Sequence, residues 1–283
     1  MQGVNHFFSV IFQNRRSTAG LIILVFFKLM ASVGPMVFTL DTTVDYENRY
    51  QMPSASHWLG TDFAGRDTWV QVVYGSKEVL TIGALTALFT LMIGAALGMF
   101  SGLVGGKPDT AIMMVTNLFL TIPAFPILLM MASIFSIRDP ISFAAVLSIW
   151  GWPGLTRAVR SQIITLKERD FIVICRVMGM SNLHIIFKEL LPNVTSYLAI
   201  NFILIMRGAI VGSIGIMMMG LAPYSPMNWG QMLVLAVQQT GGIFNPNGYI
   251  YVLSPIVALA SFQLGCIFFA NGLDEALNPR LSR

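Results

Sequence analysis

The stretch from Arg160 to Asn193 reads RSQIITLKERDFIVICRVMGMSNLHIIFKELLPN and is polar, although the segments on both sides of it are long and apolar. It carries five Lys and Arg side chains. These residues accumulate in the cytoplasmic loops of membrane proteins. We therefore expect the stretch to lie on the cytoplasmic side of a membrane, where a soluble partner can reach it.

The composition of the chain is that of a membrane protein. Of its 283 residues, 55% are hydrophobic and 11% are charged, whereas a soluble domain carries about 25% charged residues. Several stretches reach the ~20 apolar residues that a bilayer-spanning helix needs. The residue-by-residue alternation of a membrane barrel is absent from the sequence, so helices are the expected spanning elements. The predicted fold class is an all-α polytopic membrane protein.

The same composition argues against other classes. The net charge of +4 comes largely from basic residues in short loops, so it reflects membrane topology rather than nucleic-acid binding. Cys175 and Cys266 lie in different segments and the three histidines are dispersed, so we expect neither a disulfide nor a metal site. The sequence contains no GxxxxGKS or GxxxxGKT pattern, so any ATP would be bound by another subunit.

Six transmembrane helices are expected, over residues 20–40, 79–104, 110–134, 140–155, 194–221 and 249–271. Pro123 and Pro126 should break or kink the third of them. Residues 222–248 are rich in Pro, Gly and Asn and should form a loop. If both termini are cytoplasmic, eleven Lys and Arg residues lie inside and four outside, in agreement with the positive-inside rule.

Two amphipathic helices are predicted within the polar stretch, because apolar residues recur there at the i, i+3, i+4, i+7 spacing of one helix face. Gly179 can end the first helix in the left-handed conformation, and Ser181 can cap the second. Pro192 should then turn the chain in a new direction. The apolar faces comprise Phe171, Ile174, Cys175 and Met178 in the first helix and Leu183, Ile186, Phe187 and Leu190 in the second.

Such a helix pair has two interpretations. It either lies on the lipid surface as an interfacial element or inserts into a groove of a partner protein. Helix breaks on both sides favour a rigid part that transmits force.

The polar stretch also resembles a known family. Permease subunits of binding-protein-dependent ABC importers carry the pattern EAA-x3-G-x9-I-x-L-P at this place, and Gly179 and Leu191-Pro192 match its spacing. In the family the glutamate helps to engage the ATPase. The chain departs from the pattern with Val173 at the glutamate, Ile174 and Cys175 at the alanines, and Glu189 at the isoleucine.

A second motif narrows the resemblance to the second permease of dipeptide, oligopeptide and nickel importers. Residues 57–67 read HWLGTDFAGRD and resemble the HPLGTD-x-x-GRD motif of that group. Its charged residues Asp62, Arg66 and Asp67 should form a salt-bridged external turn, or else touch the binding protein.

Other family-like residues follow in order, and the resemblance runs from about residue 15 to the end of the chain. Asp170-Phe171 and Arg176 look like the peptide-importer version of the polar stretch. The remaining matches are Val73-Tyr74-Gly75, Gly105-Gly106, Ile122-Pro123, Gly220-Leu221, Trp229-Gly230-Gln231-Met232-Leu233, Asn271-Gly272-Leu273 and Asn278-Pro279-Arg280-Leu281.

The resemblance implies a type I importer permease in the cell membrane. It would pair with a homologous second permease, two cytoplasmic ATPases and an extracytoplasmic binding protein, in contact with lipid and with no nucleic acid. This chain would hold no cofactor, because the ATPases would bind ATP and Mg²⁺. Peptides are the expected cargo, and oligosaccharides or nickel chelates are the alternatives within the family.

The resemblance also implies a division of the chain. Residues 1–75 would hold the N-terminal tail, the first transmembrane helix and an extracytoplasmic segment. Residues 76–283 would form the five-helix core, with the coupling segment at 161–192. The ATPase-coupling residues would be Arg169, Asp170, Phe171, Ile174, Cys175, Arg176, Met178, Gly179 and Ser181.

Three residues near the fifth expected span are candidates for the translocation pathway. A charge at mid-membrane costs roughly 2.5–3.5 kcal/mol, so Arg207 should face protein or water, either in a structural pair or as a contact for a substrate carboxylate. Met217 and Met218 belong to a run of three methionines. They either form a flexible gate or belong to an ordinary packing surface.

Two functions of other classes are alternatives to an importer. An intramembrane protease needs a catalytic histidine or aspartate pair within its spans, and no such residue falls inside the expected spans. A passive channel would work without ATPases and would leave the amphipathic helix pair unexplained.

Overall fold

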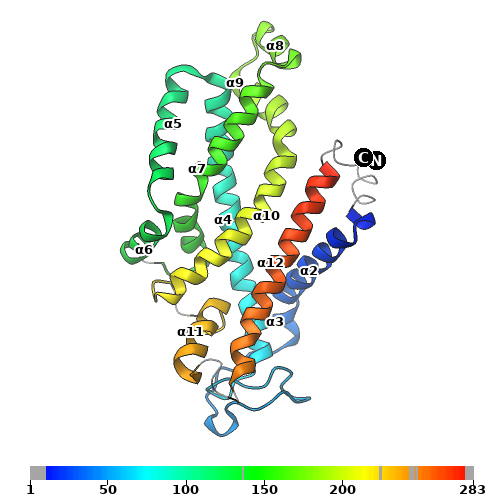
Figure 1. Cartoon of the computed structure of the whole chain (residues 1–283), viewed down its shortest axis with the longest axis vertical. Helices are drawn as coiled ribbons and strands as arrows, with labels where there is room; N and C mark the ends of the chain where they lie inside the picture. The colour runs from blue at the N-terminus through cyan, green and yellow to red at the C-terminus, as the bar shows by residue number, and fades with distance from the viewer. Residues whose placement is uncertain (1–10, 136, 223–224, 242–245, 247, 278–283) are drawn as a thin grey trace. The chain divides into compact units, whose positions relative to one another are not determined.

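The structure is a computed structural model that describes residues 11–135, 137–222, 225–241, 246 and 248–277. Figure 1 shows its helices in chain order, from blue to red. They are α2 (Arg15–Ser32), α3 (Gly34–Val37), the 3-10 turn η1 (Tyr46–Asn48), α4 (Thr68–Val104), α5 (Gly106–Thr121), α6 (Ala124–Ile134), α7 (Pro140–Leu166), α8 (Asp170–Val177), α9 (Asn182–His184), the π-helix η2 (Ile185–Leu190), α10 (Leu191–Met218), α11 (Trp229–Thr240) and α12 (Tyr249–Leu277).

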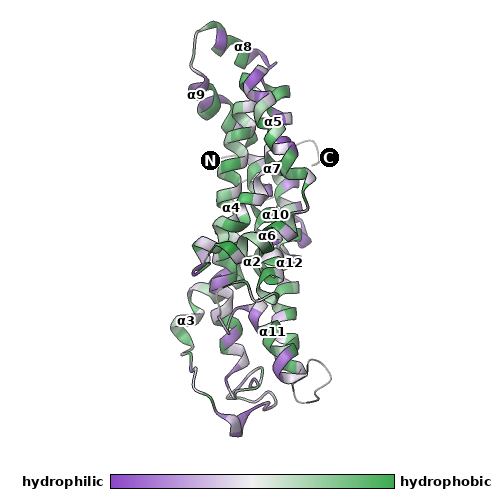
Figure 2. Cartoon of the chain, turned by 90° about the vertical axis from the view of Figure 1, so that its left-hand side faces the viewer, coloured by the Kyte–Doolittle hydropathy of each residue, from purple (hydrophilic) through white to green (hydrophobic). Residues whose placement is uncertain are grey.

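Three helices among the described residues are long and apolar enough to cross a membrane: Thr68–Val104, Asn182–Met218 and Tyr249–Ala276. The pair α5 and α6 adds a fourth if the two count as one broken span. Figure 2 shows hydrophobic residues along much of α4. The helices α2 and α7, which match the first and fourth expected spans, are not among them. Length and composition therefore show a multi-pass membrane protein, without confirming six crossings.

The interruption predicted in the third span is confirmed. Helix α5 ends before Ile122, which is extended, and α6 begins after Pro123 with its axis turned by 92°. Proline has no N–H to donate to the preceding turn, so the series of helical backbone hydrogen bonds ends there. Pro126 causes no second break because it lies in the first turn of α6, where amide groups lack helical partners in any case.

The chain divides into two compact units. The first contains the described residues of Met1–Gly83, Ser136–Phe143 and Arg207–Arg283, and the second contains those of Ala84–Phe135 and Ala144–Met206. The long helices α4, α7 and α10 contribute residues to both units.

Antiparallel packing of α2 on α12 forms the frame of the first unit. A Cβ atom on Gly20 would lie 2.5 Å from the amide nitrogen of Phe269, so only glycine permits this approach. Small residues allow such close helix contact in lipid. At the helix ends, Asn14 Nδ2 donates to a carboxylate oxygen of Glu275 over 2.7 Å. The start of α2 and the end of α12 therefore lie together (Figure 1).

The indole of Trp229 fixes α11 to this frame. Its ring is fully buried, and its Nε1 donates to the carbonyl oxygen of Val72 at the start of α4 over 2.9 Å. The ring also meets Phe27 of α2 edge-on, with centroids 5.6 Å apart, and Phe27 meets Phe262 of α12 in the same way. Asn228 caps α11 through its side chain. These contacts set the position of α11 within the first unit.

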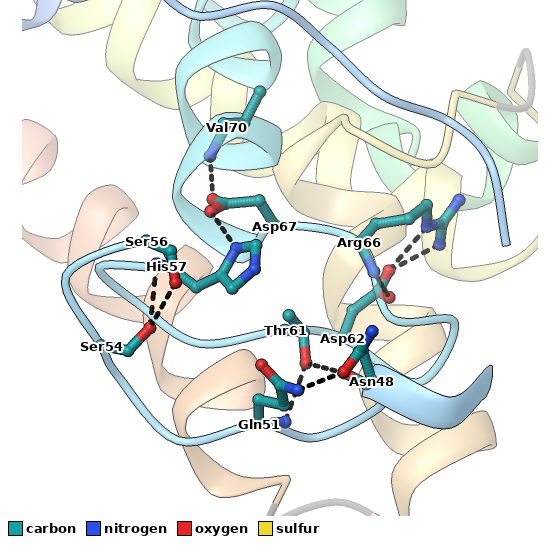
Figure 3. A network of polar contacts seen from close by, with 10 residues as sticks. All are labelled: Asn48, Gln51, Ser54, Ser56, His57, Thr61, Asp62, Arg66, Asp67 and Val70. Atoms are coloured by element: carbon teal, nitrogen blue, oxygen red, sulfur yellow. Dashed lines mark hydrogen bonds and ion pairs between the residues drawn. The ribbon is translucent and has the colours of Figure 1, made fainter. Parts of the chain in front are cut away.

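A buried carboxylate organises the loop that precedes α4 (Figure 3). Asp62 has no solvent exposure, accepts a hydrogen bond from the Gln71 side chain and pairs with the Arg66 guanidinium at 2.7 Å. His57 Nδ1 lies 2.8 Å from a carboxylate oxygen of Asp67. The predicted salt-bridged turn is thus confirmed, with His57 rather than Arg66 as the partner of Asp67.

The glycines of this loop are required by its backbone. Gly60 and Gly65 have φ values of +69° and +80°. A Cβ atom would lie 2.1 Å from the carbonyl oxygen of Gln51 at the first position and 2.0 Å from that of Asp45 at the second. Only a residue without a side chain fits both the conformation and the space.

A row of glycines on α4 forms the main helix contact of the second unit. They are four residues apart, so they share one helix face, and α7 packs directly on that face. A Cβ atom would lie 2.9 Å from Leu155 at Gly94, 2.8 Å from Val159 at Gly98 and 2.8 Å from Ile163 at Gly102.

A charge pair joins α5 to α7 in the same unit. Arg160 donates from Nε and Nη2 to the two carboxylate oxygens of Asp109 over 2.5 and 2.6 Å, and the Ser101 hydroxyl of α4 also bonds Asp109. Two parallel bonds of this kind fix orientation as well as distance. Helices α4, α5 and α7 are therefore held at one common point.

The start of α7 is set by a local cap. Pro140 occupies the first helical position, and Asp139 before it accepts hydrogen bonds from the amides of Ser142 and Ile141. These two residue types are favoured at the positions where they occur. The hydrogen bond from the Ser142 amide is the main reason why the pKa of Asp139 lies below its usual value.

The substitution Asp62→Asn should strongly destabilise the protein. It leaves the Arg66 guanidinium, which is mostly buried, without its counter-charge, and loss of one partner of a buried pair costs about 3–5 kcal/mol. Thermal unfolding of the purified protein in detergent measures the change. The control Asp41→Asn alters an exposed carboxylate whose hydrogen bonds to described residues go to Thr43 alone. Equal melting temperatures for the two variants would refute a central role for Asp62.

Candidate functional site

A glycine turn ends α8 as the sequence predicts. Gly179 has a φ of +72°, its N–H donates to the Arg176 carbonyl, and the N–H of Met180 donates to the Cys175 carbonyl. This pair of hydrogen bonds is the Schellman arrangement of helix C-termini. The space around Gly179 is open. The glycine is therefore needed for its backbone conformation and not for lack of room.

The next helix begins at the predicted cap but does not end at the predicted place. Ser181 accepts a hydrogen bond from the His184 amide over 3.2 Å. The helix then runs through the π-helix η2 into α10, so Pro192 does not redirect the chain. At the end of η2 the N–H of Leu191 donates a hydrogen bond to the carbonyl oxygen of Ile186, five residues earlier in the chain. This wider turn lets the helix pass a proline that has no N–H to offer.

One face of the α8–η2 segment is anchored in the protein interior. Arg176 Nη2 donates to the carbonyl of Leu103 over 3.0 Å, next to the C-terminal end of α4. Carbonyl groups at a helix C-terminus lack helical partners and attract cations. The buried apolar residues around this point form an anchor cluster of Ala95, Met99 and Leu103 (α4), Leu155, Val159 and Ile163 (α7), Ile172 and Cys175 (α8), Ile185, Ile186 and Leu190 (η2) and Val194 (α10).

Seven large apolar side chains of the same segment are exposed. Among them Ile174 is 57% exposed, Leu183 67% and Val177 83%. Exposed apolar groups gathered on a short segment mark an interaction surface. We call this the exposed apolar set, and it comprises Phe171, Val173, Ile174, Val177, Met178, Leu183 and Phe187.

Each of the two predicted apolar faces has some residues in the anchor cluster and others in the exposed apolar set. Cys175 of the first face and Ile186 and Leu190 of the second are buried, whereas the other members of both faces are exposed. The helical spacing shows which apolar residues share one helix face. It does not distinguish burial within this chain from burial against a partner. Ile172 and Val177 were missed because they fall outside the i, i+3, i+4, i+7 pattern.

The charged residues of the segment differ in their surroundings. Asp170 begins α8. The side chain of Arg169 has no hydrogen bond or ion pair among the described residues, whereas that of Arg176 reaches the end of α4. Val173, which stands where the resembled family has a glutamate, is exposed. The side chain available to a partner at that position is therefore apolar.

Arg207 has a structural partner. Its Nε donates to Gln263 Oε1 of α12 over 2.7 Å, and Gln263 Nε2 donates back to the Arg207 carbonyl over 3.2 Å. This reciprocal pair gives the half-buried guanidinium a neutral polar neighbour within the first unit. Met217 and Met218 lie further along α10, where Met217 is buried and Met218 is exposed. Both line a cavity of about 350 Å³.

The candidate residues form two groups. The predicted coupling residues share the α8–η2 segment of the second unit, and the predicted pathway residues lie in the first unit. Within the described part of the chain, no three His, Cys, Asp or Glu side chains are grouped to hold a metal ion. Cys175 and Cys266 are both buried free thiols.

Comparison with known proteins shows what kind of protein has this arrangement. Residues 94–283 match the family described as the binding-protein-dependent transport system inner membrane component. The chain belongs to this family. It is a multi-pass permease component of the cell membrane in a transport system, and its family is not one of catalytic enzymes.

Relatives of this permease are named transport permeases. The dipeptide transport system permease protein of Alkalihalophilus pseudofirmus is 32% identical over 95% of this chain and 87% of the relative. The oligopeptide transport system permease protein of Bacillus subtilis is 27% identical over 95% of this chain and 87% of its own length. A glutathione transport system permease protein of Pectobacterium atrosepticum is 28% identical over 87% and 80%, respectively.

A series at Gly179 tests the turn after α8. Gly179→Asn should be tolerated, Gly179→Ala should cost about 1–2 kcal/mol because a Cβ disfavours the left-handed conformation, and Gly179→Pro should be most damaging because it also removes a hydrogen bond. Hydrogen exchange of the α8 amides measures the loosening. Gly154→Ala is the control, because Gly154 lies in α7 with open space and without a positive φ. Exchange in the proline variant as slow as in the unsubstituted protein would disprove this role.

Proposed function

We propose that this permease forms half of the translocation pathway of an ATP-driven importer. Its partners would be a homologous second permease, two cytoplasmic ABC ATPases and an extracytoplasmic binding protein. The observation that carries this proposal is the exposed apolar set. It lies on a segment whose other residues are buried in the anchor cluster. A surface of this kind suits a soluble protein partner better than water.

We also infer six membrane crossings with both termini in the cytoplasm. The hydrogen bond from Asn14 to Glu275 brings the start of α2 beside the end of α12. Both ends of the helical chain therefore lie on one side, which requires an even number of crossings. The excess of Lys and Arg expected on that side supports its assignment to the cytoplasm. Residues 1–75 would then precede a five-helix core at 76–283.

The contact with the ATPase would be mainly apolar. Full burial of an Ile, Leu or Phe side chain contributes about 1.5–3 kcal/mol, and the exposed apolar set offers several of them. Val173 provides no carboxylate where the resembled family provides one. ATP and Mg²⁺ would be bound by the ATPases, and this chain would contribute Arg169, Asp170 and the rest of residues 161–192 to their docking.

Movement of the ATPases would reach the membrane helices through the anchor cluster. Helix α8 shares buried contacts with α4 and α7, and η2 runs without a break into α10. Close-packed interiors transmit displacement rather than absorb it. A push on α8 would therefore move these helices as one body, which is what alternating access requires of a permease.

Peptides are the proposed cargo. The relatives described above are named for dipeptides, oligopeptides and glutathione, and glutathione is itself a small peptide. Met217 and Met218 are proposed pathway residues because they line a cavity. For Arg207 we infer a structural role, because its pairing with Gln263 already supplies a partner to the charge.

Charge placed within the exposed apolar set should prevent ATPase binding. Ile174→Asp and Leu183→Asp should each weaken capture of the purified ATPases by at least about ten-fold, because each removes roughly 1.5–3 kcal/mol of apolar burial. Uptake of radiolabelled alanine peptides into proteoliposomes should fall in parallel. The affinity of the unsubstituted complex should change less than about three-fold between low and high salt, because apolar contacts are not screened.

The control is Asn271→Asp, which adds the same charge at an exposed residue of α12, outside residues 161–192. It should leave capture and uptake unchanged. Full ATPase binding by both Asp variants, or peptide uptake by the permeases without any ATPase, would overturn the proposal.

A further inference from the structure

The cavity beside the methionine run has an unusual lining. One wall is the end of α10 with the turn that follows it, and the other is a single face of α11 at the i, i+3, i+4, i+7 spacing. Its volume of about 350 Å³ falls within the ~300–1,000 Å³ of small-molecule sites. The lining residues are Met217, Met218, Met219, Gly220, Ala222, Gln231, Val234, Leu235 and Gln238.

Gln231 is the residue that points to a ligand. It is only 6% exposed, and its side-chain amide forms no hydrogen bond with any other residue that the structure describes. The amide atoms are not themselves fully buried, so the amide is accessible from the cavity and free to bind a ligand. Gln238 lies seven residues further along the same face of α11 and lines the same cavity. Two amides therefore border the space with donors and acceptors available.

The chemistry of the lining selects a class of ligand. A glutamine amide has one acceptor and two N–H donors, which complement the N–H and C=O of a peptide bond. The described lining residues include no charged or aromatic side chain, so none of them offers an ion pair to a chelate or a ring for stacking on a sugar. Methionine side chains adapt to varied shapes, which suits cargo whose main chain is constant while its side chains differ.

We propose that Gln231 and Gln238 bind the main-chain amide groups of a peptide in transit, with Met217 and Met218 as an adaptable wall for its side chains. This proposal rests on the proposed function and assigns it a recognition site within this chain. Selection by the main chain explains how one cavity accepts many sequences, because every peptide offers the same N–H and C=O pattern.

Isosteric substitutions test the proposal in the complete transporter reconstituted with its binding protein. Gln231→Met and Gln238→Met keep the volume and remove the amide. Each should lower the uptake of radiolabelled alanine tripeptides to pentapeptides about five-fold, the change expected from one lost hydrogen bond. Gln239→Met is the matched control, since Gln239 lies on the same helix, is exposed and does not line the cavity.

A second readout separates recognition from mere stability. Peptides methylated on a main-chain nitrogen lack one donor, so the unsubstituted transporter should carry them less well than the unmethylated peptides. The Gln231→Met variant should discriminate less between the two, because it has lost the group that detects the difference. Since the binding protein is the same in both assays, its own preference cancels in the ratio.

The outcomes distinguish the two proposals. Normal uptake and full discrimination in both glutamine variants would overturn this inference and leave the proposed peptide importer intact. Absence of alanine-peptide uptake by the unsubstituted transporter, with intact ATPase activity, would overturn the peptide cargo and this site with it. Equal loss in the Gln239→Met control would assign the effect to α11 as a whole and would also refute the site.

Discussion

The anchor cluster beneath α8 is the contact on which the arrangement of the second unit depends. It brings together α4 and α7, which packs on the row of glycines of α4, with the short α8–η2 segment. Without this contact the α8–η2 segment would have no fixed position. The hydrogen bond from Arg176 to the end of α4 adds direction to this apolar contact. A segment held in this way can keep apolar side chains exposed without collapsing onto its own helices.

The first unit uses a different principle. Its helices approach so closely that glycine is required, and a few buried polar groups then fix their rotation, such as the Trp229 indole on the Val72 carbonyl and the Arg207 pair with Gln263. Apolar contacts between helices are weakly selective in lipid, because the lipid tails are equally apolar. Close approach and specific hydrogen bonds therefore supply the orientation that a hydrophobic core supplies in a soluble protein.

Local signals in the sequence predicted local structure well. A glycine after an apolar helical pattern marks a helix end and a serine before the next pattern marks a helix start, as Gly179 and Ser181 do here. Pro123 interrupts its span as expected. Pro192 did not redirect the chain as predicted, because the π-helix η2, which no simple sequence rule announces, continues directly into α10. Which apolar residues of α8 are buried depends on α4 and α7, so periodicity alone could not decide it. Gln231 stood out only once its burial was known.

The π-helix has a consequence for how this permease tolerates changes of length. A turn of η2 contains one residue more than an α-turn and closes its ring five residues back. Loss of a single residue between 185 and 190 would restore ordinary α-helical geometry while α10 keeps its own regular ladder. Elsewhere in a long helix the same deletion would rotate every later side chain by about 100°. Within this helix, η2 is therefore the place where loss of one residue should disturb the following side chains least.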